Sequence, residues 1–73
     1  MDAKQWIAEF AAAAGAEPPN EDEVESILDL AAVAAHSSER IAAPIACWIA
    51  AGAGVQPERA RELAEGVARA DSG

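Results

Sequence analysis

The sequence predicts an all-α fold, a compact bundle of four short helices. Two observations carry this prediction: apolar residues recur every three or four positions along most of the chain, and glycine or proline interrupts that pattern at three points. No segment alternates apolar and polar residues, as a strand would. The chain has 73 residues, which is the size of a single domain. Helices are expected at residues 2–14, 21–36, 42–52 and 57–70.

The first expected helix begins after Asp2, whose side chain is suited to cap free backbone N–H groups. Gly15 supplies a helix stop, and the Pro18–Pro19 pair prevents continuation. The second helix begins after Asn20, and Glu23 three positions later completes a capping-box pattern. We expect one apolar face on each helix to be buried. These faces contain Ala3, Trp6, Ile7, Phe10 and Ala14 in the first helix, and Val24, Ile27, Leu28, Ala31 and Ala34 or Ala35 in the second.

The third expected helix begins near Pro44, a favoured residue in a first turn, and ends near Gly52. It carries no charge on any side, a pattern normally found in a helix that is buried all round. Pro57 opens the fourth helix. One side of the third helix contains Ile41, Ile45, Trp48, Ile49 and Gly52, another contains Ala42, Ala46 and Ala50, and the core-facing residues expected in the fourth are Ala60, Leu63, Ala64 and Val67.

The net charge of −8 belongs to the first half of the chain. Residues 5–39 contain eight carboxylates and no lysine or arginine, and the carboxylates are densest at the start of the second helix. A phosphate-binding surface needs a basic patch, so nucleic acid is not expected as a partner. The acidic face is either a solvated surface or a docking surface for a basic protein.

Several other classes of site are not expected. Cys47 is the only cysteine, so there is no internal disulfide, and one cysteine with one histidine does not make a closed zinc site. No cofactor is expected, because the chain has no phosphate-binding glycine motif, and Ser26 lies inside a helix, unlike the modified serine of an acyl carrier protein. We expect no signal peptide and no membrane span, since the helical part of the uncharged run is too short. These features predict a cytoplasmic location.

His36 and Arg40 are the sharpest chemical candidates in the chain. They are four residues apart, so they share one face if the helix continues through the junction between them. Three interpretations stay open. The two side chains cap the junction, they contact a partner, or His36 acts as a catalytic base, which would require a nucleophile, a metal or a substrate group beside it.

The third helix has a second interpretation. In a four-helix domain this small, three neighbours can hardly cover a helix on every side. We therefore expect part of its surface, including Cys47 or Trp48, to contact another chain, and we expect modest stability for the isolated monomer. The alternative is that Ala42, Ala46 and Ala50 are merely exposed alanines in an alanine-rich sequence.

The middle of the chain resembles a known family. The matching residues are Leu28-Asp29-Leu30-Ala31, Ala35-His36, Glu39-Arg40, Ala43-Pro44-Ile45 and Ile49-Ala50-Ala51-Gly52, together with Trp6 and the proline before the second helix. The resemblance is to a small uncharacterised helical domain of high-GC bacteria, which occurs alone or as a C-terminal extension of molybdenum-cofactor guanylyltransferase-like proteins. It spans most of residues 1–54, and Ile41 stands where the family usually has proline. It implies a molybdenum-cofactor context rather than a reaction.

We therefore predict a non-catalytic accessory domain that binds another protein. The resemblance implies that the partner is a cofactor-transfer protein or a molybdoenzyme such as formate dehydrogenase. The alternative is a free-standing homodimer of unrelated role that packs through the third helix. The candidate partner-contact residues are His36, Arg40, Pro44, Cys47 and Trp48.

Overall fold

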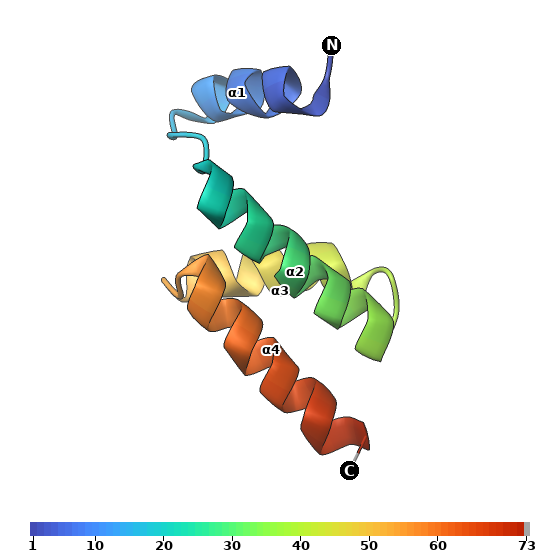
Figure 1. Ribbon diagram of the computed structural model, residues 1–73. Helices are drawn as coiled ribbons and strands as arrows, with labels where there is room; N and C mark the ends of the chain where they lie inside the picture. Colours follow the sequence, from blue (N-terminus) through green and yellow to red (C-terminus); the bar gives the residue numbers. More distant parts are fainter. Residues whose placement is uncertain (73) are drawn as a thin grey trace.

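Four helices account for most of the chain in the computed structural model, which describes residues 1–72 (Figure 1). They are α1 (Ala3–Ala14), α2 (Glu21–Ser37), α3 (Ala42–Gly52) and α4 (Pro57–Ser72). No strand is present in this range. The all-α prediction is confirmed, and every predicted helix end lies within two residues of the observed one.

Local sequence signals set the ends of the first two helices. The Asp2 carboxylate accepts a hydrogen bond from the backbone N–H of Gln5 at 2.8 Å, and the Gln5 side-chain oxygen accepts one from the Asp2 N–H at 3.2 Å. Asn20 and Glu23 make the same reciprocal pair, with both bonds at 2.8 Å. Helix α1 stops at Gly15, whose φ of 74° is a left-handed conformation that glycine adopts at little steric cost. The predicted caps are therefore present.

Helix α2 is the central element of the fold. It packs against both α3 and α4, whereas the contact between α3 and α4 is small. Figure 1 shows α2 and α4 running in the same direction, with α3 returning behind them. Helix α1 lies apart at the N-terminal end of α2, and within residues 1–72 it makes no close backbone contact with another helix. The molecule is therefore a three-helix unit with α1 as a projecting fourth element.

Small side chains make up most of the core of the three-helix unit. Leu30 of α2 is 4% exposed and Ala60 of α4 is 5% exposed, and they are the most buried residues of this unit. Alanine allows helix backbones to approach closely, because its side chain ends at Cβ. The small residues of α3 and α4 that are half-buried are Ala42, Ala43, Ala46, Cys47 and Ala50 of α3 and Ala64 and Ala68 of α4.

Most of the bulky apolar side chains lie outside this core, which contradicts the expected burial. On α2 the buried leucine is Leu30, and Leu28, which was expected inside, is exposed. On α4 Ala60 is buried as predicted, whereas Leu63 and Val67 are exposed. The physical reason is that α2, α3 and α4 pack through their small residues, which leaves the larger ones outside. The following bulky side chains were expected to be buried but are exposed in the structure: Trp6, Ile7, Phe10, Leu28, Ile41, Ile45, Trp48, Ile49, Leu63 and Val67.

Helix α3 is the helix whose burial differs most from the burial that the sequence predicts. Its charge-free sequence predicted burial on every side, but none of its 11 residues is fully buried. It contacts α2 along one side only, because α4 touches it little and α1 does not reach it. Among the helices described, none has both the length and the apolar character that crossing a lipid bilayer requires. A large part of this apolar helix therefore has no cover within its own chain.

Candidate interaction surface

The strongest candidate site is the outward side of α3. Trp48 is 80% exposed, and Ile41, Ile45 and Ile49 beside it are exposed as well. We call these four residues the α3 apolar face. Residues 41–56 contain no charged side chain, so no charged group of this helix borders the face. The opposite side of the helix, which carries the alanines, is the side that packs against α2.

The composition of the α3 apolar face is typical of protein-binding surfaces. Single exposed apolar residues are common on monomers, but contiguous patches with an aromatic centre mark sites of interaction. Tryptophan is also among the residues that contribute most to binding energy at protein interfaces. Leaving such side chains in water forgoes roughly 25 cal/mol for each Å² of apolar surface that burial would remove. The face is therefore suited to association with another apolar surface.

Helix α1 carries a second exposed apolar group. The rings of Trp6 and Phe10 stack on each other with centroids 5.2 Å apart and an interplanar angle of 10°. Both residues are exposed. We call them the α1 aromatic pair. Because the two rings stabilise each other in one orientation, they form a single flat apolar surface on a helix that makes no close backbone contact with another helix within residues 1–72.

A groove of about 430 Å³ lies between α1 and the start of α2. Ile7 and Ala8 line it from α1, and Pro18, Pro19 and Val24 line it from the linker and α2. The α1 aromatic pair lies outside this lining. Since proline restricts its own φ and the conformation of the preceding residue, the linker has little freedom. The groove side of α1 therefore faces its own chain, and the aromatic side does not.

The exposed area of the whole chain is large for its mass. A compact monomer of 7.5 kDa has an accessible surface of about 4,250 Å², whereas this chain exposes 5633 Å². Its radius of gyration is 13.0 Å, compared with about 11 Å for a compact domain of this length. The longest dimension, 42 Å, is well above the other two, 24 and 18 Å. The projecting α1 and the one-sided packing of α3 account for this excess.

The structure places His36 in a cleft of about 710 Å³ between α2 and α4. Asp29 lines the cleft from α2, and Arg61, Glu65 and Asp71 line it from α4. His36 is exposed, and among the described residues its side chain has no hydrogen-bond or ion-pair partner. The cleft is open, and small apolar side chains line it together with the charged ones, so it brings charges near His36 without a hydrogen bond that holds the ring in a defined position.

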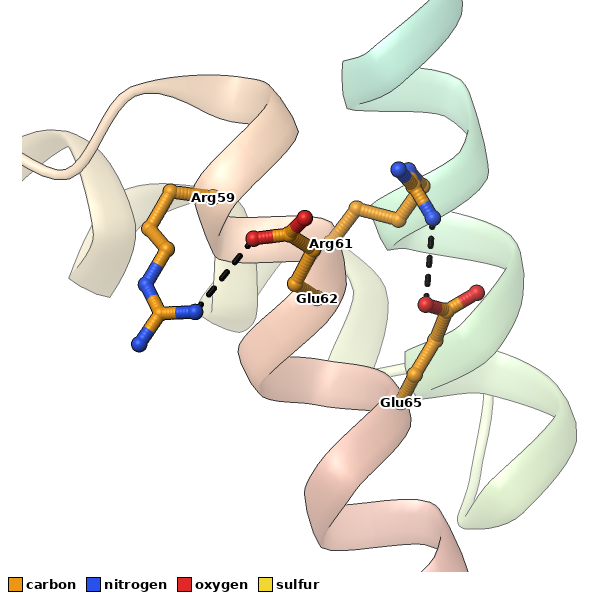
Figure 2. Close-up of polar contacts among 4 residues, drawn as sticks. All are labelled: Arg59, Arg61, Glu62 and Glu65. Atoms are coloured by element: carbon orange, nitrogen blue, oxygen red, sulfur yellow. Dashed lines mark hydrogen bonds and ion pairs between the residues drawn. The ribbon is translucent and has the colours of Figure 1, made fainter.

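Two ion pairs stabilise the start of α4 (Figure 2). Arg61 donates a hydrogen bond to the Glu65 carboxylate at 3.0 Å, and Arg59 makes an ion pair with Glu62 at 3.3 Å. Arg61 and Glu65 line the same cleft as His36 but from the α4 side, and Arg61 is the less exposed member of its pair. Each pair lies on one turn of α4, so both stabilise that helix locally rather than joining it to a neighbour.

His36 and Arg40 lie on either side of a turn instead of on one helix. Helix α2 ends at Ser37, so the condition for a shared helical face is not met. The Ser37 hydroxyl donates to the Val33 carbonyl at 2.7 Å in the last turn, and no such bond from His36 is present in residues 1–72. Arg40 is exposed, and its backbone carbonyl accepts a hydrogen bond from the Ala43 N–H at 3.2 Å. Backbone groups and the Ser37 hydroxyl thus make the hydrogen bonds of this junction.

The other three predicted contact residues separate along α3. Pro44 is exposed in the first turn of the helix, where its missing N–H leaves no bond unmade. Cys47 is half-buried on the side that packs against α2. Trp48 is highly exposed and belongs to the α3 apolar face. The five predicted residues therefore do not form one cluster, and Trp48 is the member that belongs to a contiguous surface.

Sequence reasoning did not identify the α1 aromatic pair and the α3 isoleucines as one class of exposed residue. The signal was present in the sizes of the side chains. Ile45, Trp48 and Ile49 of α3 are exposed, whereas Ala42, Ala43, Ala46 and Ala50 are half-buried, so the helix is amphipathic by volume rather than by polarity. In the part of the chain that the structure describes, no group of three or more His, Cys, Asp or Glu side chains could hold a metal ion.

Comparison with protein families gives one match. Residues 1–72 match the family described as a domain of unknown function, DUF6457. The comparisons with curated proteins and with solved structures gave no match. The family match covers nearly the whole chain and all four helices. The chain therefore belongs to the DUF6457 family.

Proposed function

We propose that this chain is a non-catalytic accessory domain that acts by binding another protein. The observation that carries the proposal is the α3 apolar face, where Trp48 and three isoleucines lie in solvent on a helix without charges. The fold buries Leu30 and several alanines but leaves most of its bulky apolar side chains exposed, and tryptophan is among the residues that contribute most to binding energy in protein interfaces. Association is what this distribution of side chains favours.

The proposed partner class rests on the resemblance noted from the sequence. That resemblance favours a molybdoenzyme, such as formate dehydrogenase, or a protein that transfers the molybdenum cofactor. The acidic start of α2 offers a second contact, because Glu21, Asp22, Glu25 and Asp29 are all exposed. Carboxylates in this arrangement would be attracted to a basic surface and would raise the rate of encounter. A cytoplasmic location is part of this proposal, and a single free cysteine suits a reducing compartment.

The proposal assigns no reaction to the chain. His36 lines the α2–α4 cleft, whereas Cys47 lies on the side of α3 that packs against α2. No hydrogen bond joins the two side chains within residues 1–72. A catalytic base needs a nucleophile or a substrate group within hydrogen-bond reach, so this placement favours binding over catalysis.

The test is affinity capture of the tagged protein from the organism that makes it, with quantitative mass spectrometry. Trp48→Glu and Val67→Glu form a matched pair, because both residues are highly exposed, at 80% and 70%, and each change adds one negative charge. We expect the wild-type chain and the Val67 variant to recover a molybdoenzyme or a cofactor-transfer protein in stoichiometric amount, and the Trp48 variant to lose it. Equal recovery by all three, or recovery of no such protein, would contradict the proposal.

A further inference from the structure

The exposed surface of the chain has the size expected for one half of an obligate dimer. The chain exposes 5633 Å², which is about 1,400 Å² more than a compact monomer of its mass. If two copies cover this excess on each other, the total buried area is about 2,800 Å². Obligate homodimers bury 2,000–5,000 Å² in total, whereas weak encounters bury less than about 1,200 Å². The excess is therefore large enough for a stable dimer.

We propose that the chain forms a two-fold symmetric dimer in which the α1 aromatic pair of each copy lies on the α3 apolar face of the other. This inference rests on the proposed function and deepens it, because it names a second copy of the chain as the protein that covers the α3 apolar face. The captured partner then binds the assembled dimer, so Trp48→Glu, which breaks the dimer, also loses that partner. The arrangement is reciprocal: each copy supplies one α1 aromatic pair and one α3 apolar face, so two equal contacts form and neither of these surfaces is left uncovered. Trp6, Phe10 and Trp48 would then meet at each of the two contacts.

A second copy fits this role better than the chain's own α1. The linker that leads from α1 to α2 contains Pro18 and Pro19, which restrict its conformations. Ile7 and Ala8 of α1 face those prolines and Val24 across one groove, which places α1 at the N-terminal end of α2. In this position α1 makes no close backbone contact with α3 (Figure 1). The aromatic pair is thus presented away from its own chain.

Charge also favours this pairing over other pairings of two copies. Each chain carries a net charge of −8, so a dimer interface must avoid apposing the acidic segments. Helix α3 contains no charged residue, and α1 contains one of each sign, Lys4 and Glu9. The contact between α1 and α3 therefore adds no net like-charge repulsion at the interface. The carboxylates at the start of α2 do not enter either apolar face, so they stay available to the proposed basic partner.

The solution mass of three variants tests the proposal. We expect the wild-type chain and Val67→Glu to have twice the chain mass of 7.5 kDa by light scattering, and Phe10→Glu and Trp48→Glu to have the monomer mass. The three altered side chains are exposed, so circular dichroism should show an unchanged helix content in each variant. A wild-type monomer, or a dimer that keeps its mass in both the Phe10 and the Trp48 variants, would overturn the proposal.

Cross-linking between single-cysteine chains tests the geometry. One protein carries Phe10→Cys and the other Ile45→Cys, both with Cys47→Ser, and they are mixed under oxidised glutathione, which accepts the electrons of disulfide formation. We expect a disulfide-linked heterodimer from the mixture and little product from either protein alone. No product in the mixture, or an equal yield from Ile45→Cys alone, would overturn the pairing of α1 with α3.

The dimer and the proposed partner can fail independently. If the chain is monomeric but Trp48→Glu still loses the captured molybdoenzyme, the dimer is wrong and the proposed function survives. If the cross-link forms but no such protein is captured, the dimer is right and the proposed partner class is wrong. The two sets of measurements therefore separate the two claims.

Discussion

Single residues at the helix ends show the closest link between this sequence and its structure. Asn20 and Glu23 exchange two hydrogen bonds of 2.8 Å, and both donors would otherwise be free at the start of α2. Three carboxylates follow in the first turn, where the helix dipole favours negative charge. These interactions depend on neighbours in the sequence, so they form without any contribution from the tertiary fold.

At this scale we predict the effect of removing one cap. Asn20→Ala deletes the acceptor for the Glu23 N–H and should lower the free energy of unfolding by about 1 kcal/mol. Asn20→Asp keeps an acceptor and should change the stability by much less. Urea unfolding followed by circular dichroism measures both. An alanine variant as stable as the wild-type chain would show that the cap does not contribute.

The same residues explain which parts of the fold could be predicted from the sequence. Asp2, Gly15, Asn20 and Pro57 are local signals, and the helix ends that they predicted lie within two residues of the observed ends. The choice of buried side is different, because apolar periodicity says that a face avoids water but not what covers it. Leu28 and Leu30 illustrate this: both are leucines of α2, but Leu30 is 4% exposed and Leu28 is 63% exposed.

At the scale of the helix, α3 has two apolar sides with different partners. Its alanines pack against α2, and its isoleucines and tryptophan lie outside. The charge-free sequence predicted burial on every side, and the second interpretation expected part of the surface, including Cys47 or Trp48, to contact another chain. Three short helices provide too little surface to surround it, so the smaller side chains take the close contact. Volume, rather than polarity, decided the orientation of α3.

This orientation predicts that the same substitution lowers the stability of the fold much more on one side of α3 than on the other. Ala46→Leu adds bulk on the half-buried side that packs against α2, and should destabilise the fold by about 1–3 kcal/mol. Ala51→Leu adds the same bulk at an exposed position of the same helix and should change stability by less than about 0.5 kcal/mol. Thermal unfolding of the two variants compares them directly. Equal effects would mean that the alanine side of α3 is not the packed side.

At the scale of the whole molecule, stability and association are linked. Leu30 and Ala60 are the most buried residues of the three-helix unit, so the isolated monomer has a small core. A process that buries further apolar surface in the folded state stabilises that state by mass action. We therefore predict that the melting temperature rises with protein concentration, as measured by calorimetry over a wide dilution series. A melting temperature that stays constant throughout would argue against dimerisation.

Ionic strength should affect the two proposed associations in opposite directions. Two copies that each carry a net charge of −8 repel one another, and added salt screens that repulsion, so the dimer should strengthen as salt rises. Binding of the acidic α2 surface to a basic partner should weaken under the same change. Sedimentation equilibrium measures the first effect, and capture at increasing salt measures the second. A dimer that dissociates as salt increases would show that charge attraction, not apolar contact, holds it together.

The solvent accessibility of Trp48 tests most directly whether the α3 apolar face is covered by a second copy. In a Trp6→Phe variant Trp48 is the remaining tryptophan, and phenylalanine keeps an aromatic ring on α1. The quenching of Trp48 fluorescence by acrylamide is measured at increasing protein concentration. We predict strong quenching in dilute solution, where Trp48 is exposed as in the monomer, and progressive protection as the dimer forms. Quenching that stays strong at every concentration would contradict the claim that two copies cover this face.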